Sequence, residues 1–241
     1  MRLKSANGWE PGIWRNHTLR HGRGFTLIEM LVVVAIIGIL SGLLFAGLPK
    51  IRDTRDVKRM QSYIKMIELG INSFHDAYNT YPISNTNMYP VPPFAVVAGV
   101  PDNVTNSLFY ELTGTFKDQF GNFISPRDLT TQLSPQFLFN RFGYSGLIHS
   151  TNSQISTDTP SPYLPSLKSD SFATFPVLNP QPTEAKQILM FNTGIRSAPG
   201  SNTIAYLRYD NRSNVRHNMK SFDLWVTWTN SFSKPVIVGN F

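Results

Sequence analysis

The sequence predicts an α+β fold in which a long N-terminal helix, apolar in its first half and amphipathic in its second, packs on a small C-terminal antiparallel β-sheet. A long, variable, loop-rich region is predicted between them. Three observations lead to this prediction. Residues 25–48 are almost uniformly apolar, residues 49–79 repeat apolar side chains every three or four positions, and residues 201–241 alternate apolar and polar side chains.

The apolar segment 25–48 is long enough to cross a membrane. Its 24 residues would rise about 1.5 Å each in a helix, which matches a hydrocarbon core of roughly 30 Å. A secretory signal has a shorter apolar region of about 7 to 15 residues. Glu29 is the only ionisable side chain of the segment, and a carboxylate at mid-membrane costs about 2.5 kcal/mol or more. We therefore expect Glu29 to have a function.

Residues 1–24 form a basic leader ahead of this segment. They contain five Lys or Arg residues and one acid, so they hold +4 of the formal net charge of +7. Basic residues that flank a membrane span stay on the cytoplasmic side. The charge therefore predicts a cytoplasmic leader and an extracytoplasmic C-terminal domain, and it is weak evidence for nucleic-acid binding.

The amphipathic segment 49–79 is predicted to continue the helix, so that one helix runs from about residue 26 to residue 79. Pro49 removes one helical hydrogen bond, and Asn79 with Pro82 ends the helix. Charged side chains occupy the face that is predicted to meet solvent or lipid headgroups. The opposite, core-facing stripe consists of Val57, Met60, Ile64, Ile67, Ile71, Phe74 and Tyr78.

The C-terminal region is predicted to form strands at 204–209, 221–228 and 236–238. One strand face would carry Phe222, Leu224, Val226 and Trp228, and the apolar stripe of the helix is the surface to bury it against.

The intervening residues 80–200 hold 14 of the 17 prolines, so we expect sparse regular structure there. Short helices are predicted near 104–112, with Asp102 or Asn103 as its cap, and near 127–140.

The sequence Gly24-Phe-Thr-Leu-Ile-Glu29, followed by an apolar helix, resembles the prepilin signal of type IV pilins and type II secretion pseudopilins. In that family a membrane peptidase cuts after the glycine and methylates the new N-terminal residue. The resemblance implies cleavage between Gly24 and Phe25 and N-methylation of Phe25. It also implies an assembly role for Glu29, whose buried carboxylate can pair with the free amine of Phe25 on a neighbouring subunit.

Two further sequence segments, which we call phrases, resemble the corresponding segments of the major, G-type pseudopilins. Tyr81-Pro82 follows the long helix, and Phe222-Asp-Leu-Trp225 precedes a terminal Gly239-Asn-Phe241. The resemblance implies a structural subunit that waits in the bacterial inner membrane and is lifted into a periplasmic pseudopilus that drives protein export. A type IV pilus subunit, acting in adhesion, motility or DNA uptake, is the alternative.

The resemblance also implies a set of partners. These are prepilin peptidase, other pilin or pseudopilin subunits in a homo-oligomeric filament, an inner-membrane assembly platform, and membrane lipid before assembly. Nucleic acid is not expected among them. Arg208, Arg212, Arg216 and Lys220 recur every four residues, but the region is predicted as strand, turn and strand, where a period of four has no meaning.

No catalytic residue, metal ligand or cofactor is predicted. Major pseudopilins usually hold calcium in a loop that here reads Thr229 to Pro235 and contains no carboxylate, and Asp210 and Asp223 alone lie nearby. Because calcium takes six to eight oxygen ligands, structural calcium is only an option. The five histidines, at positions 17, 21, 75, 149 and 217, show no metal spacing. A signal-anchored extracytoplasmic enzyme is the alternative from a second class.

Overall fold

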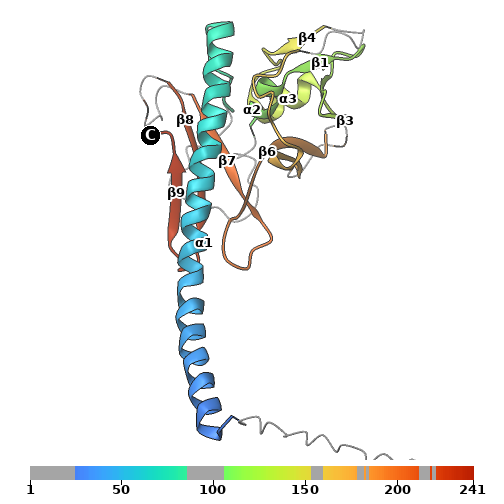
Figure 1. Cartoon of the computed structure of the whole chain (residues 1–241). Helices are drawn as coiled ribbons and strands as arrows, with labels where there is room; N and C mark the ends of the chain where they lie inside the picture. Colours follow the sequence, from blue (N-terminus) through green and yellow to red (C-terminus); the bar gives the residue numbers. More distant parts are fainter. Residues whose placement is uncertain are drawn as a thin grey trace, which may run out of the picture. The chain divides into compact units, whose positions relative to one another are not determined.

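The computed structural model describes residues 25–85, 106–152, 160–177, 182, 185–211, 218 and 221–241. The chain forms two compact units, Met1–Ala46 and Gly47–Phe241, and the α+β class is confirmed (Figure 1). The elements in chain order are α1 (Leu27–Tyr78), α2 (Leu108–Thr113), β1 (Thr115–Lys117), β2 (Phe123–Ser125), β3 (Asp128–Leu133), α3 (Pro135–Phe142), β4 (Ser150–Thr151), the short 3₁₀ helix η1 (Ser169–Ser171), β5 (Phe172–Pro176), β6 (Gln187–Arg196), β7 (Ile204–Asp210), β8 (Asp223–Thr229) and β9 (Pro235–Gly239).

The long helix α1 agrees with the predicted helix to within one residue at each end, and Pro49 lies inside it. The predicted apolar stripe is buried from Met60 to Phe74, where its five members are at most 3% exposed. The helix ends at Asn79, whose φ of 52° is the left-handed conformation that asparagine tolerates after a helix. Tyr81 then stacks on His75, with ring centroids 4.3 Å apart.

The C-terminal sheet has five antiparallel strands in the order β5-β6-β7-β8-β9. The three predicted strands correspond to β7, β8 and β9. The sheet also takes β5 and β6 from the region 80–200, for which a loop-rich structure was predicted. Strand β6 buries four consecutive residues, from Ile188 to Phe191. Because both faces of the strand are covered there, the alternation that marks a half-buried strand is missing.

A second sheet forms within the same region, with the strand order β3-β2-β1-β4. The prediction of sparse regular structure in 80–200 was therefore wrong for the described part of that range. The helix predicted near 127–140 is divided, since β3 occupies Asp128–Leu133 and α3 begins only at Pro135. Helix α3 starts there because the Ser134 hydroxyl accepts a hydrogen bond from Phe137 N at 3.1 Å. Ser107 precedes α2, and the predicted caps Asp102 and Asn103 lie outside the described residues.

One hydrophobic cluster joins the C-terminal part of α1 to the sheet and to α2 and α3. Tyr63 of α1 packs edge-on against Phe191 of β6, and its hydroxyl donates to the carbonyl oxygen of Ser171 at 2.7 Å. The predicted core face of β8 is buried, with Phe222, Leu224, Val226 and Trp228 at most 3% exposed. The helix stripe and the sheet therefore form one core.

Candidate processing and assembly site

The first turn of α1 contains a capping box, in which a helix-preceding Ser or Thr and a Glu or Gln three residues later satisfy each other's backbone amides. Thr26 N and Thr26 Oγ1 both donate to Glu29 Oε2, at 2.8 and 2.9 Å. In return, Glu29 N donates to Thr26 Oγ1 at 3.3 Å. The Thr26 carbonyl accepts the first helical bond from Met30 N at 3.3 Å. Glu29 thus defines where the helix begins.

A role for Glu29 was expected from the sequence and one for Thr26 was not, although the Thr-x-x-Glu spacing is typical of a capping box. The capping box uses only one carboxylate oxygen. Among the described residues, no hydrogen bond reaches Glu29 Oε1. Because an ionised carboxylate can accept about four hydrogen bonds, Glu29 can cap its own helix and still receive a positive group from another chain.

The rest of the segment up to Leu48 presents an apolar surface. Within the described residues, α1 is the single helix that is long and apolar enough to cross a membrane. Phe25 is 74% exposed, and the large apolar side chains from Leu27 to Leu48 are 41–83% exposed. A Cβ atom at Gly38 or Gly42 would meet nothing within 4 Å. Gly24 lies outside the described residues.

The two phrases that resemble the G-type pseudopilins meet in space. Tyr81 packs edge-on against Phe222, with ring centroids 5.3 Å apart. The carbonyl oxygen of Pro82 accepts hydrogen bonds from Tyr209 Oη at 2.7 Å and from Asn211 Nδ2 at 2.9 Å. At the C-terminus, Asn240 Oδ1 accepts from Leu224 N at 2.8 Å. Each phrase therefore fixes part of the C-terminal sheet.

The loop in which the resemblance would place calcium is held by protein groups. Asn230 Oδ1 accepts from Phe232 N and Lys234 N at 3.0 and 2.9 Å, and Asp53 Oδ1 of α1 accepts from Ser231 N and Oγ at 3.2 and 2.8 Å. Asp210 and Asp223, the other carboxylates considered, are paired in register across β7 and β8 and are buried. The described residues contain no group of three or more potential metal-ligating His, Asp or Glu side chains.

The most buried acid and the most buried histidine of the described chain form a backbone clamp. Glu111 in α2 accepts hydrogen bonds from Ile148 N and His149 N at 3.0 and 2.9 Å, and the His149 ring bonds the Glu111 carbonyl oxygen at 2.9 Å. Burial raises the pKa of Glu111 to about 7 and lowers that of His149. Since each side chain contacts backbone and is nearly inaccessible, we interpret the pair as structural.

Arg208 is the described member of the basic series at positions 208, 212, 216 and 220. Its side chain is 7% exposed, so it is not presented on the surface. Arg212, Arg216 and Lys220 lie outside the described residues.

Residues 19–45 match the family model of the prokaryotic N-terminal methylation motif. No curated protein and no solved structure matches the chain. The motif supports a type IV pilin-like subunit, of either a pilus or a pseudopilus, and such subunits are structural proteins rather than enzymes. It also implies processing by a prepilin peptidase and assembly with other pilin-type subunits. Together with the apolar part of α1, it fits a pilin-like chain anchored by one span in the inner membrane.

Proposed function

We propose that the protein is a structural subunit of a type II secretion pseudopilus. In this proposal the peptidase cuts between Gly24 and Phe25, and Phe25 is then N-methylated. The subunit is held in the inner membrane with its C-terminal domain in the periplasm. An assembly platform lifts it into a filament that drives protein export.

The match to the methylation motif over residues 19–45 is the observation that carries this proposal. The chemistry of the first turn supports it. A carboxylate among apolar side chains needs a compensating charge, and none of the described residues donates a hydrogen bond to Glu29 Oε1. Cleavage before Phe25 would create a new N-terminal amine on Phe25, four residues ahead of Glu29. The Phe25 amine of a neighbouring subunit would then pair with the Glu29 carboxylate.

Transfer from membrane to filament is physically feasible for this helix. The apolar residues from Leu27 to Leu48 can be covered either by lipid tails or by the equivalent helices of other subunits. The open space around Gly38 and Gly42 allows close approach of a second helix. The choice of a secretion pseudopilus over a type IV pilus rests on the Tyr81-Pro82 and C-terminal phrases and on their mutual contact.

A Gly24→Val variant tests processing, because a branched side chain before the scissile bond should block the peptidase. Mass spectrometry of the membrane fraction should show a precursor that keeps residues 1–24. Gly22→Val is the matched control, since it alters a glycine of the leader two residues earlier, and it should be processed. Cleavage of Gly24→Val at the same bond, or an intact leader in the unaltered protein, would overturn the proposal.

A deletion of the gene separates the two kinds of filament. For a secretion pseudopilus, exported proteins accumulate in the periplasm and surface pili are unchanged. Loss of surface pili with normal protein export would instead identify a type IV pilus subunit.

A further inference from the structure

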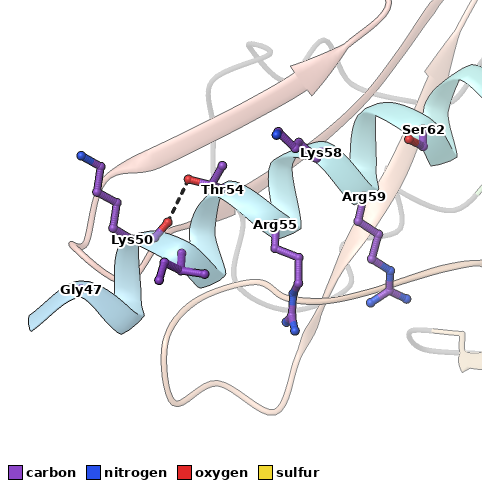
Figure 2. A pocket seen from close by; sticks show the side chains of 8 residues that line it. Gly47, Lys50, Thr54, Arg55, Lys58, Arg59 and Ser62 are labelled. Atoms are coloured by element: carbon purple, nitrogen blue, oxygen red, sulfur yellow. Dashed lines mark hydrogen bonds between the residues drawn. The ribbon is translucent and has the colours of Figure 1, made fainter. Parts of the chain in front are cut away.

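A groove with a volume of about 790 Å³ runs along the part of α1 that follows the apolar segment. Figure 2 shows Lys50, Arg55, Lys58 and Arg59 projecting from this stretch of helix. Gly47 and Ile51 also line the groove, and Ile51 is 65% exposed. We call this surface, defined by these six residues, the basic groove.

The groove lies away from the buried stripe of the same helix. Positions 47, 51, 55 and 58 succeed one another at spacings of three or four, so they share one helix face. The stripe uses positions 60, 64, 67 and 71 instead, and its members are buried in the core. The groove therefore faces away from the core except at Arg59, whose guanidinium lies 2.7 Å from where a Cβ atom of Gly194 in β6 would stand.

The positive charge of the processed chain is concentrated at this place. Residues 50–62 contain five Lys or Arg and two Asp, a net charge of +3. The remaining residues from 25 to 241 contain twelve basic and twelve acidic residues, so they are neutral as a whole. Arg55 pairs with Asp56 at 3.3 Å. Within the described part of the chain, no carboxylate lies within ion-pair distance of Lys50, Lys58 or Arg59.

The groove also follows the apolar segment closely in the sequence. Lys50 follows Leu48, the last residue of the apolar segment, by two positions. The headgroup layer extends about 5 to 7 Å beyond the hydrocarbon core on each side, so Lys50 and Ile51 fall within it when the segment is inserted. Long basic side chains at this depth extend toward phosphate groups, while their apolar stems cover hydrocarbon. Lys58 follows Leu48 by ten positions, which places it about 15 Å along the helix, roughly one Debye length outside the headgroup layer.

We propose that the basic groove binds the phosphate groups of anionic phospholipids in the leaflet adjoining the stem, before the subunit enters a filament. Lys50 meets the phosphate groups directly, Lys58 adds a longer-range attraction, and Ile51 contacts the upper acyl chain. This inference rests on the proposed insertion of the apolar segment in a membrane, but it does not depend on which filament the subunit joins or on the direction of insertion.

The test compares lipids that remain bound to the full chain in a neutral detergent. The protein is mixed with equal amounts of phosphatidylglycerol and phosphatidylcholine, and native mass spectrometry measures the ratio of the two bound lipids. The unaltered protein should favour phosphatidylglycerol. A Lys50→Gln, Lys58→Gln double variant should lower this ratio at least fivefold, since a basic residue at the membrane surface changes anionic-lipid affinity about fivefold and the contribution of the more distant Lys58 is partly screened. Lys65→Gln with Lys168→Gln, two exposed lysines outside the groove, is the matched control.

Three outcomes would overturn the proposal. The first is an equal ratio in the groove variant and the control variant. The second is displacement of phosphatidylglycerol by inorganic phosphate at the same concentration, which would identify a site for free phosphate. The third is a loss of self-association by the groove variant in sedimentation, with its lipid ratio unchanged, which would identify a second copy as the occupant. Fractionation of cells is scored separately, because failure to insert would remove the proposed function itself.

Discussion

Glu29 Oε2 accepts hydrogen bonds from both the backbone amide and the hydroxyl of Thr26, at 2.8 and 2.9 Å. The carboxylate proposed to recruit a neighbouring subunit is thus already part of its own helix terminus. Glu29 therefore has two separable properties: an acceptor oxygen, which the cap needs, and a negative charge, which pairing with an amine needs.

The pair Glu29→Gln and Thr26→Ala separates the cap from the charge. Glutamine can still close a capping box, so Glu29→Gln keeps the cap and removes the charge. Thr26→Ala removes the hydroxyl and keeps the charge, at about 1 kcal/mol of helix stability. We expect Glu29→Gln to abolish filament incorporation, because breaking a buried ion pair costs about 3–5 kcal/mol, and Thr26→Ala to retain most of it.

The measurement is the amount of each variant in sheared or cross-linked filaments, normalised to its amount in the membrane. Equal incorporation of Glu29→Gln and the unaltered protein would show that the charge is dispensable. A defect in Thr26→Ala as severe as that of Glu29→Gln would mean that capping alone explains the residue.

A second prediction concerns the pH dependence of stability around Glu111. Burial raises the pKa of Glu111 from its usual 4.5 to about 7, so the folded chain binds a proton that the unfolded chain has lost. The stability that this proton provides is fully present below pH 4.5 and is lost as the pH rises through about 7. Burial lowers the pKa of His149 below its usual 6.5, so its contribution is complete above pH 6.5 and is lost as the pH falls.

Glu111→Gln should remove the first of these opposing trends. In neutral detergent, the difference in unfolding free energy between the unaltered protein and Glu111→Gln should change by about 3 kcal/mol between pH 4.5 and 8. The unaltered protein loses more stability as the pH rises. The variant should keep the pH dependence that His149 produces, in which the unfolding free energy falls as the pH falls. A difference that is constant over this range would show that Glu111 has an ordinary pKa in the folded chain.

The parts of the fold that the sequence predicted are those whose sequence has a recognisable helix or strand pattern. α1 buries one stripe, and the segments that form β7 and β8 alternate apolar and polar residues in sequence, so periodicity located these three. β9 was located by its run of β-branched residues, Val236 to Val238. Strand β6 gave no alternation because it is covered on both faces. Strands β1 and β2 have three residues each and β4 has two, and so short a run contains too few residues for any period to be seen. Their position depends on tertiary pairing, such as Phe116 with Ile124.

The candidate site was predictable in its chemistry but not in its local geometry. Glu29 was identified because a lone carboxylate in an apolar segment is costly. The role of Thr26 depends on its hydrogen bonds to Glu29. A Thr-x-x-Glu spacing allows these bonds but does not ensure that they form. The basic groove was interpreted as a solvated or headgroup-facing side of the helix, and its hollow shape depends on how the side chains of Lys50 and Arg55 lie in the folded chain.

The third prediction concerns the carbonyl oxygen of Pro82, which ties the end of the stem to the C-terminal sheet. It accepts from Tyr209 Oη and from Asn211 Nδ2. Tyr209→Phe or Asn211→Ala alone leaves one donor, and each should cost about 1 kcal/mol of unfolding free energy. The double variant removes both donors from a shared acceptor, so its cost should exceed the sum of the two single costs by about 1 kcal/mol.

Denaturant unfolding of the four proteins, in the same neutral detergent, gives this coupling energy directly. Filament assembly is not needed as a readout, which keeps the prediction independent of the proposed function. If the two single costs simply add, the two donors act independently and the predicted coupling is absent. If all three costs are near zero, the turn after Tyr81 is fixed instead by the packing of that ring against Phe222. In that case Tyr81→Ala should be the more destabilising substitution, because a partly buried aromatic side chain is then the principal link between stem and sheet.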